Sequence, residues 1–328
     1  MNDYLFYGAM TEPIAPMDKE GNIDYELLKA QVQFQLDHKI HAIFVSGLTE
    51  CMVTSVDEQI DMLRETVKTV NGQVPVMGNI CLNRPEDALT AIRAFEEAGA
   101  DAVSIAQPHT FTYEEDAIYE YYTNLIRRTK LPVYVYNAPQ TNNILSPRLV
   151  KRLVEENENV RGYKNSVQDI LHLQSVMELI PKERHFECIA GSDSTIFATL
   201  ALGGCGIISW VSIMFPELIE ELCDAYFKGD IEGARALQFR VQKVRTILKH
   251  APMDSGYRYA GELIGLPMGY PRQPMSQTTE EQKNYIREEL TKMGMISQRS
   301  GNEAKEINNA GKLSYGLFFD WGQNSGQG

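Results

Sequence analysis

Short apolar segments rich in β-branched residues recur along the first two thirds of the chain. Seven of them read HAIFVS, VPVMGNI, DAVSIAQ, PVYVYN, VRGYK, FECIA and CGIISW, and they begin at residues 41, 74, 101, 132, 160, 186 and 205. LFYGAMTEPI near the start supplies an eighth. They do not alternate strictly between polar and apolar residues, which is typical of strands buried on both faces. The intervals between successive starts suit strand–helix–strand units.

Helix-like patterns fill the intervals between these segments. In 57–70 the apolar residues fall on one helical face, and Ser55 with Glu58 forms a capping box. Thr112 with Glu115 predicts a second capped helix start. Eight strands that alternate with helices predict a closed (β/α)8 barrel, and an open doubly wound sheet is the alternative. No GxGxxG motif follows an early strand, which removes the commonest signature of that alternative.

The strand signal stops after the last of these segments. Two helical stretches, 216–250 and 278–294, then flank a connector rich in proline and glycine. We therefore expect a barrel over 1–215, a C-terminal helical extension over 216–297, and a tail over 298–328. The tail is polar with one aromatic burst, and a disordered segment, a docking arm and an expression remnant all remain open for it.

Composition narrows the class of protein. Of the 328 residues, 43% are hydrophobic, which is enough for a barrel-sized core. The net charge is -13 without a lysine- and arginine-rich block, so a nucleic-acid partner is not expected. No apolar run approaches a membrane span, and the N-terminus lacks the basic start of a signal peptide. Five scattered cysteines without a CxxC pair argue against a disulfide or zinc framework and predict a cytoplasmic location.

A lysine at the end of one apolar segment is the strongest candidate for chemistry. Lys164 ends VRGYK, and Tyr136 lies 28 residues before it, one strand–helix unit away. In a barrel, active sites gather at the C-terminal ends of the strands, and neighbouring strands lie about 4.8 Å apart. A lysine there loses hydration, which favours its neutral amine. A neutral amine attacks a ketone to form a Schiff base, and a nearby phenol passes protons.

Plainer interpretations of these residues stay open. A lysine at a strand end usually reaches into solvent, and a tyrosine in a strand usually packs in the core. Asp193 and Ser194 follow the seventh strand, where helix caps are common. The glycines of GGCG before the eighth strand are a weak signature of a phosphate site, which makes a phosphate-binding barrel enzyme a rival class.

Several motifs together resemble the dihydrodipicolinate synthase / N-acetylneuraminate lyase family of class I pyruvate aldolases. YNAP at 136–139 and GYKNS at 162–166 are the strongest matches, and AGADAVSIAQP, AGSD and GGCGIIS support them. The resemblance runs from about residue 5 to 295. It implies a (β/α)8 TIM barrel, usually a homotetramer built as a dimer of dimers, that takes pyruvate and an aldehyde and needs no metal or organic cofactor. It also implies that Lys164 is the Schiff-base lysine and Tyr136 the proton-relay tyrosine.

The residues after the second strand depart from the family's pattern. The family has glycine, two hydroxyl residues, glycine and glutamate there, where this chain has Ser46-Gly47-Leu48-Thr49-Glu50. An ungapped match puts Gly47 and Leu48 at the positions of the hydroxyls that help hold the pyruvate carboxylate. We expect Ser46, Thr49 or backbone N–H groups at the following helix start to replace them.

Two further departures concern the second substrate. Thr110 stands where the synthase branch has a proton-relay tyrosine, and Thr141 stands where it has an arginine for a substrate carboxylate. Threonine cannot make the bidentate contact of arginine. We therefore expect an N-acetylneuraminate lyase-like or 2-keto-3-deoxy sugar acid aldolase-like enzyme. The alternatives are a 4-hydroxy-tetrahydrodipicolinate synthase of lysine biosynthesis and, second, a non-catalytic keto-acid-binding family member.

A hydroxyl-rich partner would be held by hydrogen bonds instead of a cation. The predicted substrate-binding set is Ser46, Gly47, Leu48, Thr49, Ser166, Gly191, Asp193, Ser194 and Ser209. Lys164 and Tyr136 are the predicted catalytic pair, and no metal ligand is predicted.

Overall fold

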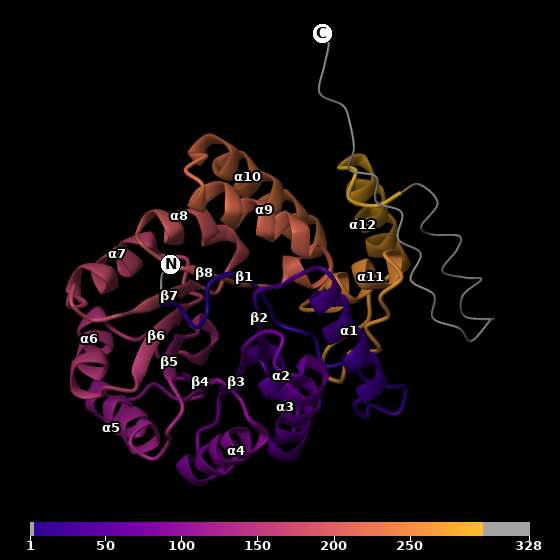
Figure 1. Ribbon diagram of the computed structural model, residues 1–328. Helices are drawn as coiled ribbons and strands as arrows, with labels where there is room; N and C mark the ends of the chain where they lie inside the picture. The colour runs from indigo at the N-terminus through magenta and orange to yellow at the C-terminus, as the bar shows by residue number, and fades with distance from the viewer. Residues whose placement is uncertain (1–2, 298–328) are drawn as a thin grey trace.

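A computed structural model describes residues 3–297 of the chain. The predicted tail, 298–328, lies outside the described residues. Figure 1 shows a ring of strands enclosed by a ring of helices, with the last helices set to one side of the ring.

Eight parallel strands close into a barrel in chain order, with β8 paired to β1. Their bounds are β1 Gly8–Thr11, β2 Ala42–Val45, β3 Val76–Ile80, β4 Ala102–Ala106, β5 Val133–Asn137, β6 Val160–Asn165, β7 Glu187–Ala190 and β8 Gly206–Ser209. Apart from Arg161, every strand residue is buried, which explains why the sequence shows no polar alternation. The predicted (β/α)8 barrel is confirmed.

Helices cover the outside of the barrel. Their bounds are α1 Tyr25–Asp37, α2 Leu48–Val53, α3 Val56–Val70, α4 Pro85–Ala98, α5 Glu115–Ile126, α6 Pro147–Glu156, α7 Ile170–Leu179, α8 Ile196–Ala201, α9 Pro216–Phe227, α10 Ile231–Leu248, α11 Ser255–Leu263 and α12 Glu280–Lys292. Three 3-10 helices join them: η1 Pro139–Thr141, η2 Asp193–Thr195 and η3 Val211–Ile213. The capping box of Ser55 and Glu58 opens α3 as predicted.

The second predicted capping box, of Thr112 and Glu115, is wrong. Helix α5 begins at Glu115 itself, and the residue before it has no side-chain cap. The chain before α5 is held by a tertiary contact instead. Asn143 accepts a hydrogen bond from the N–H of Tyr113 and donates one to the carbonyl of Phe111. These bonds fix the approach to the helix and leave Thr112 outside it.

The C-terminal helices are fastened to the loop that follows β1. Arg258 of α11 pairs with Asp254 and donates hydrogen bonds to the carbonyls of Ala15 and Met268. Arg272 in the connector pairs with Glu58 of α3. The predicted C-terminal helical extension is confirmed, and these contacts explain why α11 and α12 lie beside the barrel near α1 (Figure 1).

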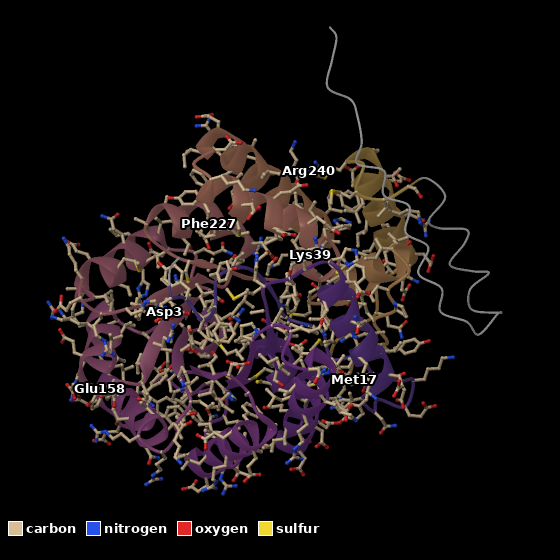
Figure 2. The ribbon with its side chains drawn as sticks, viewed as in Figure 1. Asp3, Met17, Lys39, Glu158, Phe227 and Arg240 are labelled. Carbon is tan, nitrogen blue, oxygen red and sulfur yellow. The ribbon has the colours of Figure 1, made fainter. Side chains whose placement is uncertain are left out.

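The barrel interior holds a second cluster of apolar side chains, separate from the layer between strands and helices. Its members include Phe6, Met10, Phe44, Met77, Tyr134, Tyr136, Ile189 and Ile208. Figure 2 shows side chains filling the space inside the ring of strands. The interior is therefore a packed core, and any reactive group must lie near one end of it. No helix among the described residues is long and apolar enough to cross a membrane.

Candidate active site

Lys164 and Tyr136 are direct partners across the β5–β6 pair. Both side chains are buried, with 2% and 4% of their surface exposed. The predicted pairing of the two residues on neighbouring strands is thereby confirmed in register. The absence of a side chain at Gly162 makes room for Tyr134, because a Cβ at Gly162 would lie 2.4 Å from the Tyr134 ring.

The Lys164 amine has one carboxylate and two aromatic faces as neighbours. Nζ lies 3.3 Å from Oε2 of Glu12, 3.6 Å from the ring centroid of Phe44 and 4.2 Å from that of Tyr136. Burial lowers the pKa of Lys164 below its usual value, while the Glu12 carboxylate opposes that shift. The site therefore weakens the hold of the lysine on its proton but keeps an acceptor for that proton in contact.

Glu12 is the residue that the sequence reasoning missed. It directly follows β1, and only 5% of it is exposed. Its carboxylate lies against the backbone of Gly47, where a Cβ would be 1.6 Å from Oε1. Glu12 obeys the rule that functional side chains of a barrel gather at the C-terminal ends of the strands, so its position directly after β1 is the signal in the sequence that identifies it.

The structure explains the unusual loop after β2. Ser46 has φ 60, a left-handed conformation, at the position where the family carries glycine. Gly47 has φ -58, a backbone conformation that any residue can adopt. Glycine is needed there because a side chain would overlap the Glu12 carboxylate. Leu48 opens α2 and is buried, whereas Thr49 is half-buried. The hydroxyl of Ser46 is buried without a hydrogen-bond partner among the described residues, so it is free to hydrogen-bond a bound substrate.

The Tyr136 phenol is linked to the edge of the site through Ser166. Ser166 Oγ lies 3.2 Å from the phenol oxygen of Tyr136 and 3.0 Å from the carbonyl oxygen of Gly191. The carbonyl can only accept, so Ser166 donates to Gly191 and Tyr136 donates to Ser166. Burial, chiefly, and the nearby Glu12 raise the pKa of Tyr136. The phenol is therefore protonated and oriented.

Asp193 and Ser209 contact each other. The Ser209 hydroxyl donates to Asp193, and it accepts from the N–H of Ser212. Both residues are buried, and burial raises the pKa of Asp193. Ser194 is half-buried in η2. The predicted role of these residues in substrate binding stays a proposal. The hydrogen bond between Asp193 and Ser209 also has a structural role, because it joins the chain after β7 to the end of β8.

The two threonines that depart from the synthase pattern differ in setting. Thr110 is exposed and has φ 80, a strained conformation for a β-branched residue. Thr141 is buried, and its hydroxyl donates to the carbonyl of Ala138. Two residues further on, the backbone carbonyl of Asn143 accepts a hydrogen bond from the Gln107 side chain. Position 141 thus supplies no positive charge.

The closed barrel places a buried lysine and a buried tyrosine side by side at the ends of adjacent strands, which is the arrangement that the motifs predict for a class I aldolase-type site. Among residues 3–297 no cluster of three potential metal ligands occurs. The Dihydrodipicolinate synthetase family matches residues 5–293, and the chain belongs to that family. This match confirms the family resemblance that the motifs indicate, and with it the expected enzyme class, the carbon–carbon lyases.

Individual relatives agree with this assignment. A curated 4-hydroxy-tetrahydrodipicolinate synthase of Archaeoglobus fulgidus is 28% identical over 295 residues, which cover 89% of this chain and all of that protein. The crystal structure of dihydrodipicolinate synthase from Thermotoga maritima superimposes with a TM-score of 0.85 at 27% identity, covering 89% of this chain and 100% of that one. A prophage protein of E. coli K12, solved in complex with pyruvate, shares the fold at 23% identity and a TM-score of 0.85, with 89% of this chain and 100% of that chain covered.

Proposed function

We propose that the protein forms a Schiff base between Lys164 and pyruvate and uses it to make or cleave a carbon–carbon bond. The observation that carries the proposal is the buried amine of Lys164 beside the ring of Tyr136, at the C-terminal ends of β5 and β6. Burial favours the neutral amine that a ketone requires as its nucleophile. The family relationship supports the same chemistry.

The residues fit distinct steps of such a reaction. The Lys164 amine attacks the ketone carbon, water leaves, and the protonated imine withdraws electrons from the neighbouring methyl carbon. Loss of a proton there gives an enamine that attacks an aldehyde, and the reverse sequence cleaves the bond. Tyr136, protonated and held by Ser166, is the group suited to move a proton at the aldehyde oxygen. This assigns Tyr136 to the carbon–carbon step.

Borohydride trapping tests the proposal. The protein is incubated with pyruvate and sodium borohydride, and peptides are mapped by mass spectrometry. We expect one added pyruvate-derived group on Lys164 and none on Lys164→Met. The absence of an adduct would refute the Schiff-base mechanism and favour the non-catalytic keto-acid-binding alternative, whereas labelling at another lysine would refute the role of Lys164.

The identity of the aldehyde is a finer question. The expectation of a sialic-acid-like or sugar-acid lyase has less support than its alternative, because the curated relative carries the name 4-hydroxy-tetrahydrodipicolinate synthase. We therefore propose aspartate semialdehyde as the first candidate partner of pyruvate. Thr110 and Thr141 favour a neutral, hydroxyl-rich aldehyde as the second candidate, because position 141 offers no cation for a substrate carboxylate.

A side-by-side assay separates the two candidates. Pyruvate with aspartate semialdehyde is compared with cleavage of N-acetylneuraminate and of 2-keto-3-deoxy sugar acids. Thr141→Arg is the informative variant, since an added cation should improve kcat/KM for aspartate semialdehyde only if the carboxylate binds near position 141. We keep a homotetramer as part of the proposal, and sedimentation velocity at micromolar concentration checks it. The cytoplasmic location stays a prediction.

A further inference from the structure

A buried glutamate touches the reactive amine, and the proposed chemistry above leaves it without a role. Glu12 and Lys164 are 152 positions apart in the chain, and their side chains are 6% and 2% exposed. Burying a carboxylate is costly unless it is paired or used. Its only partner at hydrogen-bond distance among the described side chains is the Lys164 amine itself.

The surroundings are shaped to hold this carboxylate at the amine. Gly47 provides the space, since any larger residue there would overlap Oε1 and the carboxyl carbon. Phe44 and Tyr136 present ring faces to Nζ and therefore offer it no lone pair. Within the described residues, Glu12 is the one side chain that accepts a hydrogen bond from Nζ.

We propose that Glu12 is the acid–base partner of Lys164 in imine formation. This inference rests on the proposed Schiff-base function. Glu12 first takes a proton from the Lys164 ammonium, which leaves a neutral amine and a neutral carboxylic acid. The amine attacks the ketone carbon, and after proton transfer from nitrogen to oxygen a neutral carbinolamine stands beside Glu12. Glu12 then gives its proton to the carbinolamine hydroxyl, which leaves as water, and the nitrogen lone pair forms the C=N bond. The net change is ammonium plus ketone to iminium plus water, with Glu12 returned to its ionised form.

Two neighbouring groups are less suited to this step. The phenol of Tyr136 is not hydrogen-bonded to Nζ, because the amine lies over the ring face. Glu50 is buried, and burial, chiefly, together with the Glu12 charge raises its pKa; among the described residues it makes no hydrogen bond to Nζ. Glu12 alone combines contact with the reacting nitrogen and a basic oxygen.

The assignment also resolves a conflict of charge. A 2-keto acid brings its own carboxylate next to the carbon that Lys164 attacks, and two carboxylates this close repel each other. When Glu12 holds the lysine's proton, the keto-acid carboxylate is the one negative charge left among these three groups, so no second carboxylate repels it at the moment of attack. The proton transfer therefore prepares the nucleophile and admits the substrate in one event.

The rate of imine formation in Glu12→Gln tests the proposal. Rapid-quench borohydride trapping with saturating pyruvate at pH 7.5 gives this rate for the unchanged chain and the variant. If Glu12 is the acid–base group, the variant forms imine on the order of 100-fold more slowly. If Glu12 is only a counter-ion, its removal makes the amine more often neutral, and imine formation becomes faster. Slowing supports the proposal, whereas an equal or faster rate overturns it.

Additional variants secure the interpretation. The half-saturating pyruvate concentration should not rise in Glu12→Gln, because a negative charge is lost near the substrate carboxylate; a rise together with the slow rate would indicate a distorted site and contradict the proposal. Glu50→Gln, which changes a second buried glutamate that makes no hydrogen bond to Nζ, is the matched control and should form imine at the unchanged rate. Glu12→Asp keeps the carboxylic acid but moves it away from the amine, because aspartate is one methylene shorter. We expect its rate to lie between those of Glu12→Gln and the unchanged chain.

If circular dichroism shows that Glu12→Gln does not fold, the rate of Glu12→Asp decides. An unaltered or faster rate there overturns the proposal, and a rate at least tenfold slower supports it.

The two proposals fail in different ways. Without an adduct on Lys164 in the unchanged chain, the Schiff-base function fails and the role of Glu12 fails with it. With an adduct there and an undiminished rate in Glu12→Gln, only the role of Glu12 fails.

Discussion

The Lys164 amine lies over the face of the Tyr136 ring, 4.2 Å from its centroid, and not at the phenol oxygen. A ring face stabilises the ammonium form of the lysine, while the hydroxyl points to Ser166. Ring and hydroxyl thus act on different partners. Replacing tyrosine by phenylalanine keeps the first interaction and removes only the second.

Tyr136→Phe should slow turnover about 100-fold or more, because the carbon–carbon step loses its proton carrier. Imine trapping on Lys164 should persist, since the ring face remains. Steady-state turnover and borohydride trapping measure the two effects. Tyr134→Phe is the control on the same strand: its hydroxyl contacts Glu187. It should lose about 1 kcal/mol of unfolding free energy and keep turnover. Near-normal turnover in Tyr136→Phe would reject its role.

Ser166→Ala should lower turnover less than Tyr136→Phe does. The phenol keeps its proton but loses the oxygen that orients it, 3.2 Å away. We expect a loss of about 10-fold, at the low end for an acid–base group. Adding Ser166→Ala to Tyr136→Phe should not lower turnover below that of Tyr136→Phe alone, because the two residues act together. Additive losses in kcat would show that Ser166 works independently, for example on the substrate.

Lys164→Met should destabilise the protein by about 3 kcal/mol, because Glu12 would remain buried without its cation. Adding Glu12→Gln should restore part of this loss, since the double variant contains no unpaired charge. Urea unfolding of the two single variants and the double variant at pH 7 gives the coupling free energy. Coupling near zero would mean that the pair is not ionised in the folded state.

The pH dependence of stability should differ between two glutamates. Burial raises the pKa of Glu50, so between pH 4.5 and that raised pKa the folded state binds more protons than the unfolded state. Stability then falls as pH rises, and Glu50→Gln should reduce the fall. Glu58 has the opposite sign, because Arg272 lowers its pKa. Its contribution is complete above pH 4.5 and is lost as pH falls through that lowered pKa, so Glu58→Gln should cost more stability at pH 7 than at pH 4. Urea unfolding from pH 4 to 8 checks both, and parallel curves for Glu50→Gln and the unchanged chain would contradict the assignment.

The order of the elements followed from the sequence alone. Apolar strand segments without polar alternation, separated by helical patterns, were sufficient for the barrel. The spacing of one unit between Tyr136 and Lys164 was sufficient to place them side by side, because consecutive parallel strands in a barrel pair in order. These are local patterns and short-range topology, which the chain itself encodes.

Contacts across the barrel mouth depended on the tertiary structure. Glu12 follows β1 and Lys164 ends β6, two strands that are not neighbours, so no spacing rule brings their side chains together. Barrel closure and the space left at Gly47 decide that they meet. Likewise, Asp193 and Ser209 read as separate strand-end groups in the sequence, and only the folded chain joins them. Side-chain directions inside a closed barrel depend on all eight strands at once, and a linear pattern records only one strand at a time.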